Sequence, residues 1–293
     1  MELAERLANR SGNFSAYLSA FIVVFIWSGW ITLSRMGVQT SLTPYDITFL
    51  RFGTAALLTL PFSLRYDWKN VHWYRILLVA LGAGFPYTML SFIGLKTVKA
   101  AGAGVLVNGM LPVLGLFFTL FWFKEKVSPL KYLAIIVLLI SNLLIANIVS
   151  GLSAASLPGI LCLFGAALVY SVNMAATKRW GYGKKDVIAF VPLVNFVLFL
   201  PFWFTTTSAI PDAILQDVLI QMIYQGVVVS IFALLLITHS INKLGSGTMS
   251  VFLSYVPVVT AGLAFLFLKE TLSFSEQAGI VLCSVGLMIY SKG

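Results

Sequence analysis

The chain has 293 residues, of which 59% are hydrophobic and 10% charged, with a formal net charge of +9. Ordinary soluble domains carry about 25% charged residues, and the mean hydropathy here is +0.96. These values exclude a soluble globular domain and predict a polytopic α-helical membrane protein, whose solvent is lipid. The apolar runs are long and unbroken, which excludes a β-barrel. Basic residues lie in short groups between those runs, which disfavours a nucleic-acid partner.

Apolar runs of about 20 residues, the length that a helix needs to cross a bilayer, predict ten transmembrane helices. The first five are expected at residues 16–34, 44–64, 73–93, 100–123 and 129–148. The second five are expected at residues 157–177, 187–206, 219–240, 247–268 and 274–291. The chain then divides into two five-helix domains, residues 1–150 and 151–293. The polar segment 1–13 does not have the pattern of a secretory signal.

Two helix starts carry recognisable capping residues. Ser128-Pro129 is expected to supply an N-cap and a first helical residue, and Ser273 with Glu276 is expected to form a capping box.

Lysines and arginines are distributed unevenly between the two ends of the predicted helices. With ten spans, fourteen of them fall on the side that holds both termini. Only Arg35, Lys96, Lys99 and Lys269 fall on the other side, while Arg51 lies within the membrane. Because cytoplasmic loops are enriched in basic residues, both termini are expected in the cytoplasm.

One segment occurs twice in the chain. Residues 111–146 and 256–291 match at six of 36 positions at an offset of 145. The informative matches, of residue types that are scarce here, are Pro112/Pro257, Lys124/Lys269, Glu125/Glu270 and Ser128/Ser273. Five helices per half is an odd number, so the second half should cross the membrane in the opposite sense. Such inverted repeats favour alternating access around a midplane site.

These residues resemble a known family. Two copies of a proline followed by a Lys-Glu pair, whose Glu lies thirteen residues after the proline, are similar to the EamA-type repeat of the drug/metabolite transporter superfamily. Trp27-Ser28-Gly29 and Leu50-Arg51-Phe52 are also similar to that repeat. The resemblance implies a ten-helix carrier of the bacterial cytoplasmic membrane. It also implies an exporter of amino acids or related metabolites, with the YddG-like aromatic amino-acid exporters as the nearest type. Asn195-Phe196 departs from the pattern where an Arg-Phe pair is sought in the second half.

Polar and aromatic side chains at membrane depth are the candidates for a central cavity, because each must find a partner or line a cavity. If their helix faces converge, the cavity suits a small amphipathic molecule better than a bare ion. The same residue types also join membrane helices to each other, so both roles stay open. The candidates are Trp27, Trp30, Arg51, Tyr87, Ser91, Asn108, Tyr170, Asn173, Tyr224, Gln225 and Ser254.

Arg51 lies about seven residues into the second helix, roughly 11 Å at 1.5 Å per residue. A buried arginine costs about 2.5–3.5 kcal/mol on insertion scales, so a partner is expected. Asp46 points to a different face of the helix and is a poor partner. Two hypotheses remain: Arg51 contacts backbone carbonyls at a helix break, or it contacts an anionic group of a substrate.

Three prolines within spans, Pro86, Pro112 and Pro257, interrupt backbone hydrogen bonding and are predicted hinges. Glu125 and Glu270 at helix ends are interpreted as structural pins beside the adjacent lysines. No carboxylate lies in the middle of a predicted span, so a proton relay is not supported and facilitated diffusion or exchange is favoured.

The favoured function is therefore a secondary transporter of a small molecule. An antiporter of anionic or phosphorylated metabolites and a multidrug exporter remain alternatives. A membrane-embedded lipid-modifying enzyme is a remote one, because no catalytic or metal-binding cluster is present, and a channel lacks the expected charged ring or filter. No cofactor and no metal are expected. The expected partners are the substrate and the lipid bilayer, with the monomer as the functional unit.

Overall fold

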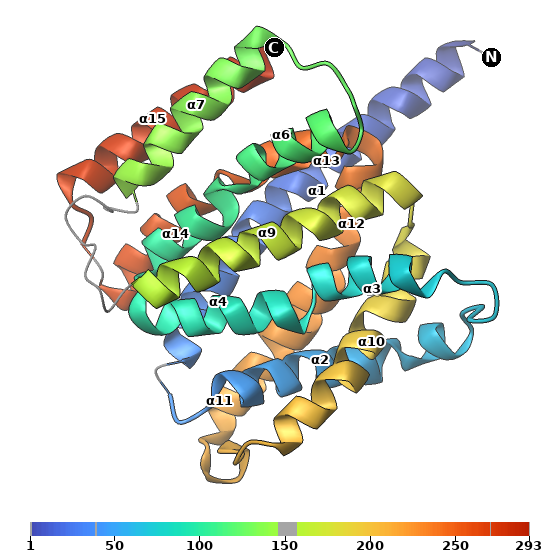
Figure 1. Ribbon diagram of the computed structural model, residues 1–293, viewed down its shortest axis with the longest axis vertical. Helices are drawn as coiled ribbons and strands as arrows, with labels where there is room; N and C mark the ends of the chain where they lie inside the picture. Colours follow the sequence, from blue (N-terminus) through green and yellow to red (C-terminus); the bar gives the residue numbers. More distant parts are fainter. Residues whose placement is uncertain (1, 39, 146–156, 270, 293) are drawn as a thin grey trace.

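The computed structural model describes residues 2–38, 40–145, 157–269 and 271–292, and every regular element in these ranges is a helix. The predicted pin Glu270 and the last residues of the predicted fifth helix lie outside the described residues. Ten helical spans follow one another along the chain (Figure 1). Spans three, four, eight and nine each consist of two or three consecutive segments.

The first half contains spans one to five. Its segments are α1 (Glu2–Gly37), α2 (Pro44–Leu64), α3 (Trp73–Gly82) with α4 (Phe85–Thr97), α5 (Ala100–Gly104) with η1 (Val105–Gly109) and α6 (Leu111–Phe121), and α7 (Pro129–Ile145).

The second half contains spans six to ten. Its segments are α9 (Leu157–Trp180), α10 (Lys184–Phe204), α11 (Leu215–Ile220) with η3 (Gln221–Ala233) and α12 (Leu234–Leu244), α13 (Ser246–Leu253) with α14 (Val256–Leu263) and η4 (Ala264–Leu268), and α15 (Phe274–Ser291). A short 3₁₀ turn, η2 (Ile210–Asp212), precedes α11.

Within the described residues, eight spans are long and apolar enough to cross a bilayer, and two shorter apolar helices, Pro129–Leu144 and Phe274–Tyr290, complete the ten-helix arrangement. Successive spans run back and forth, so that both termini lie at the same end of the molecule (Figure 1). Five spans per half invert the second half relative to the first, as the sequence predicted. Expected and observed boundaries agree within three residues, apart from the end of span three and the two ends of span eight, which differ by four residues, and the start of α1, which lies further upstream.

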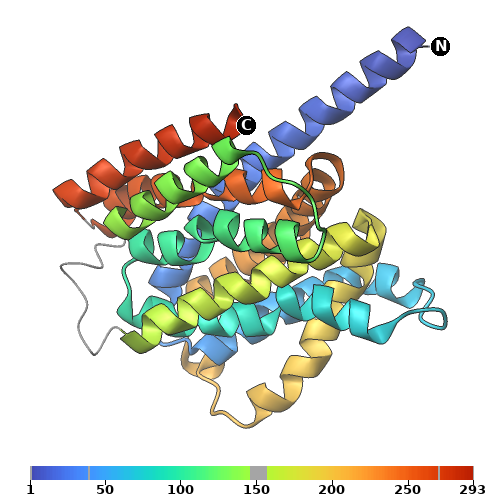
Figure 2. The same cartoon turned by 45° about the horizontal axis from the view of Figure 1, so that its top comes forward.

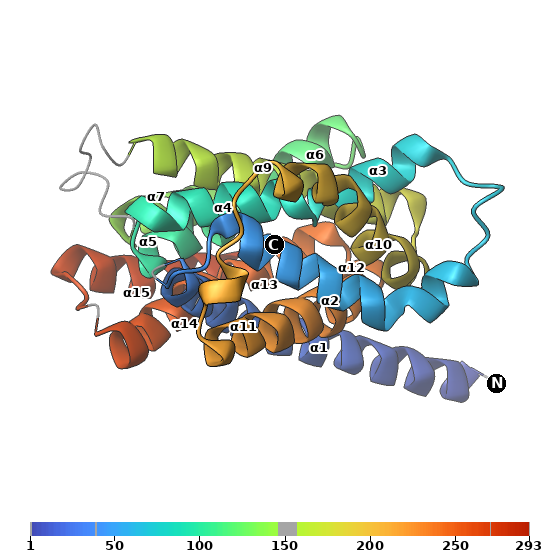
Figure 3. The ribbon, with the colours of Figure 1, turned by 90° about the horizontal axis from the view of Figure 1, so that it is seen from below.

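Packing between the halves follows the repeat. The equivalent helices α2 and α10 pack against each other, and so do α7 and α15, which lie side by side at one edge (Figures 1 and 2). Span three packs on α9, while α1, the equivalent of α9, packs on span eight. Seen from below, α9 and α1 lie on opposite sides of the bundle (Figure 3). This exchange of equivalent pairs is what a two-fold relation between inverted halves requires.

All three predicted hinge prolines begin a new helical segment within a span. Pro86, Pro112 and Pro257 are the second residues of α4, α6 and α14, positions where the missing N–H of proline is tolerated. The spans are therefore interrupted at these prolines. Their role as hinges stays a prediction.

The repeated Lys-Glu segment adopts the same unusual backbone in both halves. Lys124 and Lys269 have φ values of 56° and 58°, a left-handed conformation that L-residues other than glycine adopt infrequently. The expected capping box of Ser273 and Glu276 is confirmed, and α7 begins at Pro129 with the Lys131 N–H 3.4 Å from Ser128 Oγ.

Asp46 connects the two halves at the end opposite the termini. It is fully buried, caps α2 with Thr43, and accepts hydrogen bonds from Ser208 Oγ at 2.7 Å, the Ala209 N–H at 3.0 Å and Trp203 Nε1 at 3.2 Å. The expectation that Asp46 is not a partner of Arg51 is consistent with this set of contacts.

Candidate functional site

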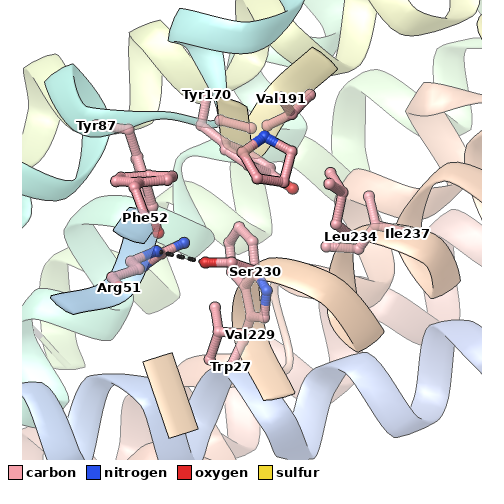
Figure 4. Close-up of a pocket in the computed structure, with 12 residues that line it drawn as sticks. Trp27, Arg51, Phe52, Tyr87, Tyr170, Val191, Val229, Ser230, Leu234 and Ile237 are labelled. Atoms are coloured by element: carbon pink, nitrogen blue, oxygen red, sulfur yellow. Dashed lines mark hydrogen bonds between the residues drawn. The ribbon is translucent and has the colours of Figure 1, made fainter. Parts of the chain in front are cut away.

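A small cavity lies between the two halves, bounded by spans one to three of the first half and spans six to eight of the second (Figure 4). Its volume is about 20 Å³, room for about one water molecule. The side chains on it are mostly aromatic or aliphatic, and the one charged group among them is Arg51. The residues that line it are Trp27, Arg51, Phe52, Ala83, Tyr87, Tyr170, Val191, Pro192, Val229, Ser230, Leu234 and Ile237.

Arg51 is 4% exposed, and both of its hydrogen bonds go to uncharged acceptors of η3. Its Nε donates to Ser230 Oγ at 2.9 Å (Figure 4), and one terminal nitrogen lies 3.4 Å from Gln225 Oε1. The guanidinium also lies over the rings of Trp30 and Phe52, at 5.7 and 5.3 Å from their centroids. Among the described residues no carboxylate pairs with it, so this buried cation is stabilised by dipoles and ring faces alone.

Gln225 joins three polar groups to the guanidinium. Its Oε1 accepts a hydrogen bond from Trp30 Nε1 at 2.7 Å as well as the longer one from Arg51. Its Nε2 donates to Ser34 Oγ at 3.0 Å and to Gln221 Oε1 at 3.2 Å. The backbone of η3 is π-helical, and Ser230 Oγ donates to the Gln225 carbonyl five residues earlier at 2.8 Å. This widened turn places Gln225 and Ser230 together beside Arg51, and π-bulges often occur at functional sites.

Four aromatic side chains from three spans surround the cavity on the side of α1. The Trp27 ring lies 4.6 Å from Tyr170 and 6.0 Å from Tyr87, and Tyr87 lies 5.2 Å from Tyr170 and 5.4 Å from Trp30. These separations are those of packed aromatic pairs. The Tyr87 hydroxyl is buried and has no hydrogen-bond partner among the described residues. It is therefore an unused polar group in the same cavity as Arg51.

The two halves differ at the position of Arg51. α2 and α10 have the same length and begin and end 140 residues apart, with Asp46 and Asp186 at the same place in their first turns, so the equivalent of Arg51 is Val191. Asn195, where the sequence predicted the departure from the Arg-Phe pattern, lies four residues further along α10 and bonds to the break in span three. Its Oδ1 accepts the Phe85 N–H at 2.9 Å and its Nδ2 donates to the Ala80 carbonyl at 2.8 Å. One repeat thus supplies a cation to the cavity, and the other supplies the aliphatic side chain of Val191 there, while Asn195 holds a helix break.

The structure brings six of the predicted site residues together around the cavity: Trp27, Trp30, Arg51, Tyr87, Tyr170 and Gln225. Four of the other five form hydrogen bonds outside the cavity, and Asn108 is buried without a hydrogen bond to a described residue. Asn173 Nδ2 donates to the Val79 carbonyl at 2.7 Å, and the Tyr224 hydroxyl donates to the Ile26 carbonyl at 2.9 Å. Both contacts join two spans, the role that small and polar groups commonly have in membranes.

Ser91, Ser254 and Asn108 do not line the cavity. Ser91 Oγ donates to the Tyr87 carbonyl of its own helix, and Ser254 Oγ to the Val251 carbonyl. Asn108 is fully buried in η1, and neither of its amide atoms has a hydrogen-bond partner among the described residues. A transport role for these residues stays a prediction.

Sequence reasoning missed most of the aliphatic lining and, more importantly, Ser230. It is the one polar side chain between Gly226 and Ile237, which is a usable signal once a partner for Arg51 is sought. The ordinary helical period does not place Gln225 and Ser230 on one face, so the π-helical register hid the pair.

A second, polar cavity of about 150 Å³ opens at the end that carries the termini, between spans four, five, six, eight, nine and ten. We call it the vestibule; among its lining residues are Glu125, Lys126, Lys131, Lys178, Ser250 and Tyr290. Lys178 pairs with Glu125 at 3.0 Å. A separate space of about 10 Å³, with Ser171 and Met174 in its lining, shares Gly115 and Ser250 with the vestibule. Ser171 directly follows Tyr170 of the cavity.

Two inverted five-span halves around a central cavity are the arrangement that inverted-repeat membrane transporters share. The sequence matches the EamA-like transporter family twice, over residues 14–147 and 157–292. The chain therefore belongs to the EamA-like transporter family. An "Uncharacterized transporter" of Archaeoglobus fulgidus is 20% identical to it over 288 residues, which cover 94% of this chain and 97% of the relative. A solved crystal structure with 18% identity has the same fold, with a TM-score of 0.71 over 95% of this chain and 96% of its own.

Proposed function

We propose that this protein is an alternating-access transporter that exports a small amphipathic metabolite, such as an amino acid or a related compound, across the cytoplasmic membrane. The observation that supports this most is the central cavity, to which each half contributes three spans. At about 20 Å³ it is too small for any metabolite, so passage requires the halves to rearrange. A pore that stays open would not need such a rearrangement.

We propose that transport proceeds by facilitated diffusion or exchange. Among the described residues the buried carboxylates are Asp46 and Glu276, and both cap helix starts. Neither lies beside the cavity, so no acidic relay leads to it. The basic loops support an orientation with both termini in the cytoplasm, and two complete halves in one chain support a functional monomer.

Counterflow into proteoliposomes tests the carrier mechanism. Vesicles preloaded with an unlabelled solute should accumulate the labelled solute transiently, with saturation, for at least one member of a panel of amino acids and amphipathic amines and acids. Uptake that rises linearly with concentration and is not stimulated from the opposite side would indicate a channel and refute the proposal.

A pair of matched variants ties transport to the cavity. Leu234 lines the cavity and is 8% exposed, whereas Leu161 on α9 is 61% exposed. Leu234→Trp adds a large side chain where space is absent and should abolish counterflow, while Leu161→Trp should leave it unchanged. Equal counterflow in both variants would show that the solute does not pass this cavity.

A further inference from the structure

We propose that the transported molecule is an organic monoanion, a carboxylate on an apolar or aromatic body, whose carboxylate binds Arg51 and which passes through the vestibule. This inference rests on the proposed transport function and narrows its amphipathic metabolite to a related compound that carries the carboxylate but no ammonium group.

The first observation is the unbalanced charge of Arg51. An arginine has five N–H donors, and among the described residues only two acceptors, both neutral, are within hydrogen-bond distance of Arg51. A carboxylate can accept two parallel hydrogen bonds from a guanidinium, and such charge-assisted pairs are about twice as strong as neutral ones. An anion would therefore supply the counter-charge that the described residues do not.

The second observation is the Tyr87 hydroxyl, which is 1% exposed and lines the same cavity without a partner. The hydroxyl can donate one hydrogen bond to an anion, but it carries no negative charge with which to stabilise a cation as a carboxylate would. Together with Arg51 it offers donors to an anionic group. Phe52, Val229 and Leu234 around them offer apolar surface to the rest of the molecule.

The same geometry disfavours an amine. No carboxylate lines the cavity, and the guanidinium would repel an ammonium group placed beside it. The rings of Trp27, Tyr87 and Tyr170 pack on each other at 4.6–6.0 Å between centroids, so they form a closed cluster and not an open aromatic cage. A phosphate dianion would leave one charge unmatched by the single arginine.

The vestibule has the charge that an anion path requires. Three lysines, Lys126, Lys131 and Lys178, line it together with one glutamate, Glu125, which pairs with Lys178. The surplus of positive charge attracts anions and raises their local concentration. The proposed path runs from the vestibule past the small space that shares Gly115 and Ser250 with it, and then along α9 from Ser171 to Tyr170 beside Arg51.

Four probes that share a phenyl group test the charge preference: 3-phenylpropionate, phenylalanine, 2-phenylethylamine and, as a dianion, phenyl phosphate. We expect calorimetric titration of the purified protein to give at least tenfold tighter binding of 3-phenylpropionate than of the amine, with the zwitterion and the dianion weaker than the monoanion. Tighter binding of the amine or of the zwitterion would overturn the proposal, as would tighter binding of phenyl phosphate or binding of none of the four.

Arg51 variants test the residue. Arg51→Gln should weaken 3-phenylpropionate binding by about 10- to 100-fold, the range for a charge-assisted hydrogen bond, and Arg51→Lys should weaken it less. Arg65→Gln is the matched control, since Arg65 is an exposed residue at the end of the same helix. An unchanged affinity in an Arg51→Gln protein that elutes as a single species would refute the assignment.

Counterflow separates this inference from the proposed function. Exchange of phenylalanine or the amine that Arg51→Gln does not alter would leave a carrier but end the anion assignment. Arg51-dependent binding of 3-phenylpropionate without exchange would support the anion site and contradict the transport proposal.

Discussion

Replacing Gln225 with leucine should destabilise the contact between α1 and η3. The side chain is fully buried and makes hydrogen bonds of 2.7, 3.0 and 3.2 Å to Trp30, Ser34 and Gln221. Leucine leaves the Trp30 N–H as a buried orphan donor, which costs about 1–3 kcal/mol. Hydrogen bonds between membrane helices average about 0.6 kcal/mol, so the other two add about 1 kcal/mol. The expected total is roughly 2–4 kcal/mol.

Thermal unfolding in detergent measures this loss. At about 2–4 °C per kcal/mol for a chain of this size class, the apparent Tm should fall by roughly 4–16 °C. Gln216→Leu is the control, because Gln216 is exposed in the same span and should shift the Tm by less than about 2 °C. Equal small shifts in both variants would refute the argument.

A double variant isolates the cause. Trp30→Phe removes the indole donor and keeps an aromatic ring, so Gln225→Leu in that background leaves no orphan indole N–H. The loss of the 3.4 Å contact from Arg51 is the same in both backgrounds and cancels in the cycle. The two substitutions should therefore be less than additive by about 1–3 kcal/mol. Strict additivity would show that lost packing, and not the unsatisfied donor, destabilises Gln225→Leu.

Three further predictions concern the contacts that hold the breaks and ends of the spans. Asp46→Ala removes a buried carboxylate that accepts hydrogen bonds from α2, α10 and the segment after α10, so it should lower the free energy of unfolding by at least about 2 kcal/mol. Asp212→Ala, at an exposed site, should leave it unchanged in the same unfolding assay. A Cβ on Gly84 would collide with the Asn195 side chain, while nothing lies within 4 Å of a Cβ on Gly262. Gly84→Ala should therefore lower the free energy of unfolding by about 1–3 kcal/mol, and Gly262→Ala should leave it unchanged. Equal Tm values for the two variants would contradict this. Pro112→Ala should slow counterflow more than it weakens binding, because it can restore backbone continuity in span four without touching the cavity; an equal loss of both would speak against a hinge.

The ten spans and the inverted relation of the halves were predictable because they depend on coarse properties. A bilayer of fixed thickness sets the length of each apolar run, and an odd number of spans per repeat sets the inversion. The Lys-Glu repeat was also informative, since Lys124 and Lys269 share an unusual backbone conformation. Local rules sufficed for the helix starts at Pro129 and Phe274.

The site was only partly predictable, because its geometry depends on departures from regular helices. Trp30 and Arg51 could be identified as candidates from their type and depth. The π-helical turns of η3 bring Ser230 to Arg51, and no 3.6-residue period indicates that. Asn173 and Tyr224 have the right chemistry but bond to backbone carbonyls of neighbouring spans, a choice that depends on the distance between helices.

The unequal pair Arg51 and Val191 has an electrical consequence. Moving one elementary charge across a membrane is worth about 2.3 kcal/mol per 100 mV, so a voltage acts on the guanidinium in proportion to any change of its depth. With an anion bound, the centre is neutral and its reorientation is indifferent to the potential. The unloaded protein retains the positive charge, so its return stroke is the step that a membrane voltage accelerates or retards.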